Sequence, residues 1–150
     1  MAPTVQPQRS FVLLTNTRAN AGTIDITLPA PSRGFLRRWE YLQAFLNTAP
    51  IAGDYTQLWM TPTTAFTAFA SPGMQLNYVV HDTSTEPIPL IGSSTLNQNN
   101  SARRFDGIRP FTHDVEVLSV RHATTVVGGN TLNLRGIYRD FAQTLNVGTS

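Results

Sequence analysis

Hydrophobic and polar residues alternate along several short segments of the chain. The clearest is 23–28 (TIDITL), where Ile or Leu fills every second position and Thr or Asp fills the positions between. A period of two is typical of a strand with one buried face. Pro29 and Pro31 end this strand, because proline cannot donate a hydrogen bond to a sheet. The further predicted strands are 10–16, 55–61, 76–81, 114–122 and 131–141.

Segment 35–46 (FLRRWEYLQAFL) is compatible with two structures. Large apolar residues recur every three or four positions from Phe35 to Leu46, as on one face of a helix. Read with a period of two instead, Trp39 and Tyr41 lie on the same face of a strand. The aromatic content and the strand-rich surroundings favour a long strand, and a helix stays as the alternative.

Turn and loop signals divide the remaining chain. Residues 20–22 (NAG) and 128–130 (GGN) contain Gly and Asn, which accept positive φ, and the second group predicts a hairpin. Residues 83–106 are polar, rich in Pro, Ser and Asn, and predict a long loop available for interaction. We therefore expect an all-β protein, an antiparallel β-sandwich, over 11–141. An extended arm (1–10) precedes it and a tail (142–150) follows it.

Composition narrows the function classes. The 150 residues include 11 Arg and no Lys against 9 acidic residues, and only 13% are charged. Cys is absent, which excludes disulfides and Cys-ligated metals. No apolar run approaches the roughly 20 residues of a membrane-spanning helix, and the first residues do not resemble a signal peptide. A weakly charged surface rich in Thr, Asn and Gln is typical of a subunit covered by its neighbours.

The histidines are the first candidates for chemistry. His81-Asp82 and His113-Asp114 could belong to a metal site or an acid–base pair, with His122 nearby in sequence. Adjacent strand residues point to opposite faces, however, so one such pair cannot easily supply two ligands. We expect the histidines at the surface or at an interface, with no metal and no cofactor. The chain also lacks a nucleophile elbow and a phosphate-binding loop, so we expect no enzymatic activity.

Aromatic and arginine residues have alternative roles. Trp39, Tyr41, Trp59 and Tyr78 could form a sugar-stacking platform, but their position in predicted strands favours the core. The small net charge of +2 argues against nucleic acid as a partner and favours ion pairs between subunits or a solvated surface. Arg suits subunit interfaces, but codon bias would explain the absence of Lys equally well. The candidate interface residues are Arg9, Arg37, Arg38, Arg103, Arg104 and Arg109.

Segments 22–31 (GTIDITLPAP), 55–59 (YTQLW) and 131–138 (TLNLRGIY), together with the aromatic segment between them, resemble those of small virion proteins. These are β-sandwich or jelly-roll-like proteins that include decoration and accessory proteins of tailed bacteriophages. The resemblance implies that the sandwich is jelly-roll-like and that the chain is a structural protein of the virion, assembled in the host cytoplasm. It also implies a homo-oligomer, such as a trimer, that contacts other virion proteins on a capsid or tail and no membrane.

Two alternatives remain beside this hypothesis. One is a carbohydrate- or receptor-binding module that uses Trp39, Trp59 or Tyr78. The other is a hydrolase built on His81, His113 and Asp114, which requires these groups to lie within hydrogen-bonding reach.

Overall fold

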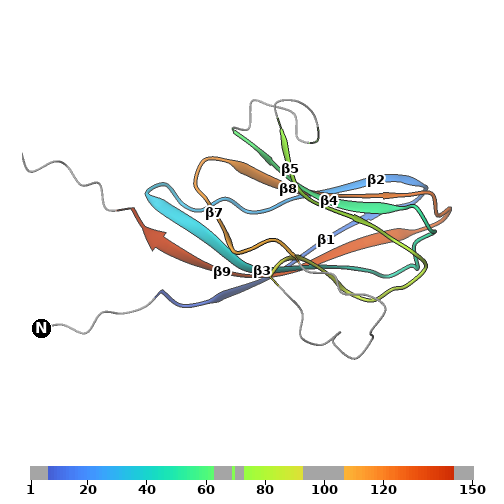
Figure 1. Cartoon of the computed structure of the whole chain (residues 1–150), viewed down its shortest axis with the longest axis horizontal. Helices are drawn as coiled ribbons and strands as arrows, with labels where there is room; N and C mark the ends of the chain where they lie inside the picture. Colours follow the sequence, from blue (N-terminus) through green and yellow to red (C-terminus); the bar gives the residue numbers. More distant parts are fainter. Residues whose placement is uncertain (1–6, 63–68, 70–72, 93–106, 144–150) are drawn as a thin grey trace, which may run out of the picture.

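Two antiparallel sheets pack face to face in the computed structural model, which describes residues 7–62, 69, 73–92 and 107–143 (Figure 1). Nine strands occur in these residues: β1 (Ser10–Arg18), β2 (Gly22–Thr27), β3 (Phe35–Leu46), β4 (Tyr55–Thr61), β5 (Met74–Val80), β6 (Ile88–Ile91), β7 (Phe111–His113), β8 (Val117–Thr124) and β9 (Asn130–Ala142). The expected all-β sandwich is confirmed.

The strand order is that of a jelly roll. Sheet A has the order β1-β9-β3-β6, with β7 also paired to β3, and sheet B has the order β2-β8-β4-β5. Only β4 and β5 are both consecutive in the chain and paired with each other. The other neighbours in each sheet are brought together from distant parts of the chain, as in double-sheet jelly rolls.

Segment 35–46 is a strand, and its helix-like spacing has a physical cause. Trp39 pairs with Tyr138 and Tyr41 pairs with Ile137, so Glu40 is an extra residue that forms a β-bulge. The bulge changes which positions point inward: Trp39 is buried before it, and Leu42 is buried after it. A three-residue step between buried positions in a strand therefore resembles the spacing of a helix. The prediction that Trp39 and Tyr41 share a face is wrong for the same reason.

Two sequence predictions need correction, and one short strand is missing from the predicted set. The 128–130 turn does not form a hairpin, because β8 lies in sheet B and β9 in sheet A. The predicted loop 83–106 contains β6, whose four residues are all buried. Pro89 of β6 pairs with Gln43 of β3. Since β6 is an edge strand of sheet A, the backbone N–H that proline lacks is not needed for a further strand. The three-residue strand β7 was also missed, since so short a segment shows no alternation.

The core lies between the inner faces of the two sheets. The alternation predicted for 23–28 is confirmed, with Ile24, Ile26 and Leu28 buried and the residues between them exposed. Trp39 is fully buried and packs against Tyr138, with ring centroids 5.1 Å apart. The other fully buried large apolar residues are Leu42, Leu58, Leu90, Ile91, Leu118, Leu132 and Leu134.

Parts of the predicted arm, loop and tail lie outside the described residues, namely 1–6, 93–106 and 144–150. Strand β1 begins at Ser10, the last residue of the predicted arm, and β9 ends at Ala142, the first residue of the predicted tail. Within the described residues, no helix has the length and hydropathy needed to cross a membrane.

Candidate functional site

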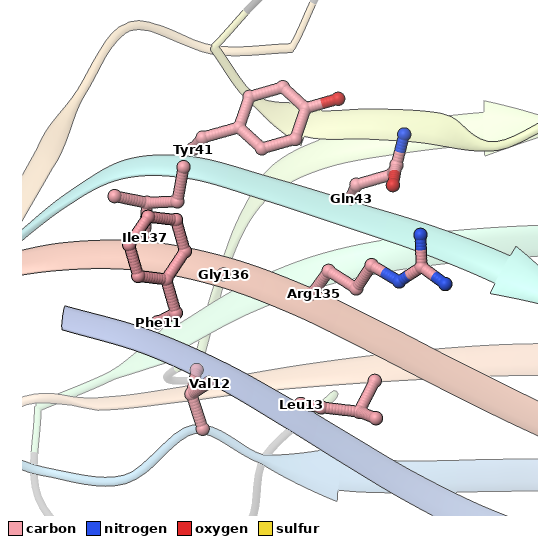
Figure 2. Close-up of a pocket in the computed structure, with 8 residues that line it drawn as sticks. All are labelled: Phe11, Val12, Leu13, Tyr41, Gln43, Arg135, Gly136 and Ile137. Atoms are coloured by element: carbon pink, nitrogen blue, oxygen red, sulfur yellow. The ribbon is translucent and has the colours of Figure 1, made fainter.

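The outer face of sheet A carries an apolar row across three adjacent strands (Figure 2). Phe11 on β1 and Tyr41 on β3 both pair with Ile137 on the central strand β9. One step along, Leu13 and Gln43 both pair with Arg135. Residues directly opposite on neighbouring strands have side chains on the same face, so these two rows form one surface. We call it the outer face of sheet A.

This surface is open to solvent although it is largely apolar. Phe11 is 77% exposed and Leu13 is 63% exposed, which is unusual for two large apolar residues only two positions apart. Together with Tyr41, Ile137 and the backbone of Gly136, they line a shallow hollow of about 470 Å³. Contiguous exposed apolar surface of this kind marks interaction sites more often than scattered single residues do.

Charged residues flank the apolar row, and the first group begins with Arg139, two residues after Ile137 on β9. Arg139 forms an ion pair with Glu40, the bulge residue, and Arg9 lies 3.8 Å from the same carboxylate. On the other side, the Arg135 guanidinium stacks on the Phe45 ring at 4.4 Å from its centroid. The surface thus has an apolar centre with polar and charged surroundings, as in protein interfaces.

The outer face of sheet B is different in character. Its exposed positions on β2 are Thr23, Asp25 and Thr27. Asp25 accepts two hydrogen bonds from Arg121, at 2.7 and 2.8 Å, and this pair lies across β2 and β8. The polar and charged positions on this part of sheet B make it an ordinary solvated face. On β5, at the edge of sheet B, Met74, Tyr78 and Val80 are exposed as well. Phe11 and Leu13 are more exposed than these and line a hollow with their neighbours, so the outer face of sheet A is the candidate site.

The structure places the predicted interface arginines in three different environments. Arg9, Arg38 and Arg109 are exposed, and Arg38 lies on the outer face of sheet A, opposite Arg139. Arg37 is buried and contacts groups of its own chain. The last two candidates, Arg103 and Arg104, lie outside the described residues.

Arg37 forms a charged cluster between the strand ends. Its guanidinium donates to both carboxylate oxygens of Asp140, at 2.8 and 3.0 Å, and to the carbonyl oxygen of Pro29 at 2.9 Å. It also lies over the ring of Tyr138, 3.9 Å from the centroid. The hydrogen bonds to Asp140 raise the pKa of Arg37, although burial acts in the opposite direction. The cluster fixes the end of β9 against β3, so Arg37 has a structural role inside the subunit.

All three histidines are buried, so the expectation of surface histidines is wrong. The indole Nε1 of Trp39 donates to His113 Nε2 at 3.0 Å, and His113 Nδ1 lies 2.9 Å from the Glu116 carbonyl oxygen. His113 is therefore neutral, with its proton on Nδ1. Burial lowers the pKa of His113, which keeps it neutral at physiological pH.

His81 and His122 share one hydroxyl group. The Thr56 Oγ1 atom lies 2.7 Å from His81 Nε2 and 3.0 Å from His122 Nδ1, and the two rings meet edge to face with centroids 5.1 Å apart. A hydroxyl donates one hydrogen bond, so one ring nitrogen accepts from it and the other donates to it. Burial lowers the pKa of both histidines, and the neighbouring His81 contributes to a pKa of about 4 for His122.

Asp54 is the buried acid beside this pair. Its carboxylate accepts hydrogen bonds from the backbone of Ile51 and Thr125 and from the hydroxyls of Thr124 and Thr125, at 2.8 to 3.0 Å. Burial alone would raise the pKa of Asp54, but these hydrogen bonds lower it below its usual value. The carboxylate thus stabilises the turn before β4 and the end of β8.

These polar groups do not form the catalytic set considered from the sequence. His81 contacts Thr56 and His122, whereas His113 contacts Trp39 and the Glu116 backbone, so the two belong to separate clusters. The Asp114 carboxylate accepts a hydrogen bond from Gln143 at 2.8 Å. Among the described residues, no group of three or more His, Asp or Glu is placed to hold a metal ion.

The aromatic residues proposed as a sugar platform are also separated. Trp39 is fully buried and cannot stack on a ligand, so its assignment to the core is confirmed. Trp59 is half-buried and meets Phe69 edge-on at 6.1 Å, while Tyr78 is exposed and packs against Tyr55 at 5.2 Å. Tyr78 is therefore not a core residue.

Sequence reasoning did not identify Phe11 and Leu13 as surface residues. Segment 11–14 (FVLL) is uniformly apolar, and such a run predicts a strand buried on both faces. In the structure, β1 is an edge strand and only Val12 and Leu14 pack on the core. Nothing within 11–14 itself distinguishes an edge strand from a central one.

Comparison with known proteins gives no family. No family model and no curated protein sequence matches the chain. Among solved structures, it is similar to a chain of Bacillus endospore appendages, described as disulfide-linked pili, at 10% identity and a TM-score of 0.39, over 95% of this chain and 96% of that one. A chain of Sulfolobus Turreted Icosahedral Virus is 14% identical with a TM-score of 0.45, over 92% of this chain and 30% of that one. A chain of Tomato Aspermy Virus is 10% identical with a TM-score of 0.38, over 100% of this chain and 86% of that one. Since all three TM-scores are below 0.5, the functional argument rests on the geometry of this chain alone.

Proposed function

We propose that the protein is a structural subunit that assembles with copies of itself into a larger particle. The observation that carries this proposal is the exposed apolar row on the outer face of sheet A, where Phe11 and Leu13 protrude into solvent. Covering such a surface contributes about 25 cal/mol per Å² of apolar area, which favours association.

The more specific role that we propose is that of a virion protein of a bacteriophage. The protein would decorate, cement or project from a capsid or tail and would be assembled in the host cytoplasm. The jelly-roll strand order supports this role, because capsid proteins are one of the classes built on it. The proposed partners are copies of this chain, for example in a trimer, and other virion proteins. The exposed residues Arg9, Arg38 and Arg109 are candidate contacts there.

The proposed role is not enzymatic. The histidines support this view, since burial lowers the pKa of each and all three are hydrogen-bonded to neighbouring groups of the fold. We also propose no nucleic-acid contact, because the net charge is only +2 and Arg37 and Arg121 both pair with carboxylates.

Multi-angle light scattering on the purified full chain tests the proposal. We expect a molar mass that is an integer multiple of the monomer mass and that falls on dilution. A molar mass equal to that of one chain at every concentration up to millimolar would contradict self-assembly.

A second candidate function is carbohydrate or receptor binding, and one observation favours it. Tyr78 is exposed and stacked with Tyr55 on β4 and β5, a geometry that can support a sugar ring. Glycan-array binding that is lost in Tyr78→Ala and retained in Phe11→Ala would support this function over assembly through sheet A.

A further inference from the structure

Strand β1 forms one edge of sheet A, and this edge is only partly covered. Along its inner side, β1 pairs with β9 from Ser10↔Tyr138 to Arg18↔Asn130. Along its outer side, no strand of the described residues pairs with it. Backbone N–H and C=O groups on a free edge bind water or a further strand.

The two halves of this edge differ. At the C-terminal half, the Asn16 side-chain amide donates to the Asp25 carbonyl oxygen of β2 at 2.8 Å, and Arg18 Nε donates to the Ala21 carbonyl oxygen at 3.0 Å. The turn and β2 therefore occupy that side. The N-terminal half, Ser10–Leu14, has no such contact among the described residues and is the accessible part.

The accessible half also lacks the features that protect most edge strands. Natural edges carry a charge, a proline or a bulge that prevents another strand from adding. From Ser10 to Thr17 this strand has no charge and no proline, and its pairing with β9 is continuous without a bulge. Its outward side chains Phe11 and Leu13 are the most exposed part of the apolar row.

We propose that β1 of a second copy pairs antiparallel with β1 around a twofold axis at Val12, which makes sheet A continuous across a dimer. This inference rests on the proposed function and names the contact that builds the first step of assembly. The interface is isologous, since the same strand contributes from both sides. A further strand pairs with the backbone groups of Ser10–Leu14 along their whole length, and a second copy supplies one.

The register follows from side-chain direction and charge. With Val12 opposite Val12, Phe11 of each copy lies opposite Leu13 of the other, and all four outward side chains join one apolar surface. A slip by one residue would put outward side chains opposite inward ones. In the proposed register, Arg9 lies opposite Thr15, so like charges do not meet, whereas pairing of Arg9 with Arg18 would be repulsive.

The absence of cysteine allows a direct test of this register. We expect Phe11→Cys and Leu13→Cys proteins, mixed and oxidised, to form a disulfide-linked heterodimer. Directly opposite strand residues have Cα atoms roughly 4.5–5.5 Å apart, within disulfide range. Each variant alone should cross-link at least tenfold less, because identical positions are then diagonal, about 7–8 Å apart. Equal cross-linking of the mixture and of each variant alone would overturn the register.

A charge on the edge provides the second test. Leu13→Glu places a carboxylate directly opposite Arg135 of the same chain, so the fold should be retained, as a thermal melt can check. In the dimer, the carboxylate would lie beside Phe11 of the other copy. We expect the dimer dissociation constant to rise at least tenfold, measured by sedimentation equilibrium. The matched control is Val127→Glu at a position 85% exposed in the turn before β9, which should leave association unchanged.

The outcomes separate this inference from the proposed function. If the protein assembles but neither the cysteine mixture nor Leu13→Glu has its expected effect, the edge proposal is wrong and self-assembly stands. If the unmodified protein and all of its variants are monomeric, the edge proposal and the proposed self-assembly are both wrong. If deletion of 144–150 is needed before the cysteine mixture cross-links, the tail of the same chain covers this edge and the dimer proposal fails.

Discussion

The indole ring of Trp39 lies directly over the backbone of Gly136, with no room for a side chain between them. A Cβ atom at position 136 would come within 2.5 Å of the Trp39 ring and 3.2 Å of Val12. Trp39 is fully buried and its Nε1 is bound to His113, so the ring cannot move away without breaking that hydrogen bond. The glycine therefore permits the close contact between β3, β9 and the core.

We expect Gly136→Ala to destabilise the fold by about 1–3 kcal/mol, the usual effect of overpacking a core. Urea denaturation followed by tryptophan fluorescence measures this change. Gly129→Ala is the matched control, because a Cβ there meets nothing within 4 Å and the change should be small. Equal stability of the two variants would show that Trp39 has space to shift.

The second prediction concerns the hydroxyl shared by two histidines. Thr56→Val keeps the shape of the side chain but leaves His81 Nε2 and His122 Nδ1 without this partner. We expect a loss of about 1–3 kcal/mol in the free energy of unfolding, since buried polar atoms left unpaired cost this much. Thr56→Ser should recover most of that loss. If Thr56→Val and Thr56→Ser lose equally, packing and not hydrogen bonding determines the effect.

The third prediction is a dependence of stability on pH. The folded-state pKa of His122 is about 4, below the ordinary 6.5, and that of His81 is also lowered. Between pH 4 and pH 6.5 the unfolded chain therefore binds more protons than the folded chain. The contribution of these histidines to the free energy of unfolding is fully present above pH 6.5 and is lost as the pH falls toward 4. For His122 alone, the loss is on the order of 3 kcal/mol. Denaturation at a series of pH values should show this slope, and His122→Gln should flatten it.

The fourth prediction compares two arginine–aspartate pairs of similar geometry. Arg37 binds Asp140 next to the core, whereas Arg121 binds Asp25 on the solvated face of sheet B. Arg37→Lys loses the bidentate contact, and we expect a cost of about 2 kcal/mol, as for hydrogen bonds to charged groups. Arg121→Lys should cost less than about 1 kcal/mol, because exposed ion pairs contribute little. The ratio of the two losses, from parallel denaturation curves, checks the role of burial.

The part of the fold that sequence could predict is the part determined by local alternation. Strand β2 has a strict period of two, and its buried residues were predicted correctly. In β3, the extra residue Glu40 breaks this period, so the pattern was ambiguous until the pairing with β9 was known. Strand β6 contains Pro89, whose missing donor is harmless only because of its place in the sheet. Such tolerance depends on tertiary neighbours that the local sequence does not contain.

The candidate site was harder to predict for a related reason. Whether Phe11 is buried or exposed depends on what covers β1, and strand neighbours in this fold come from distant positions. Arg37 and Arg38 are adjacent and chemically identical, yet one is buried against Asp140 and the other is exposed. The alternation of side chains in β3 separates them, and predicting it requires knowing which face of the strand is inside.

The pairing of the first strand with the last has a consequence for synthesis on the ribosome. Ser10 pairs with Tyr138, and β3 also needs β9 beside it, so sheet A cannot close until the C-terminal strand has emerged. Until then, the nascent chain leaves β1 and β3 without their common neighbour, and it is open to aggregation or chaperone binding. An assembly-competent subunit therefore exists only after Asn130–Ala142 has left the ribosome, however early the preceding strands are made.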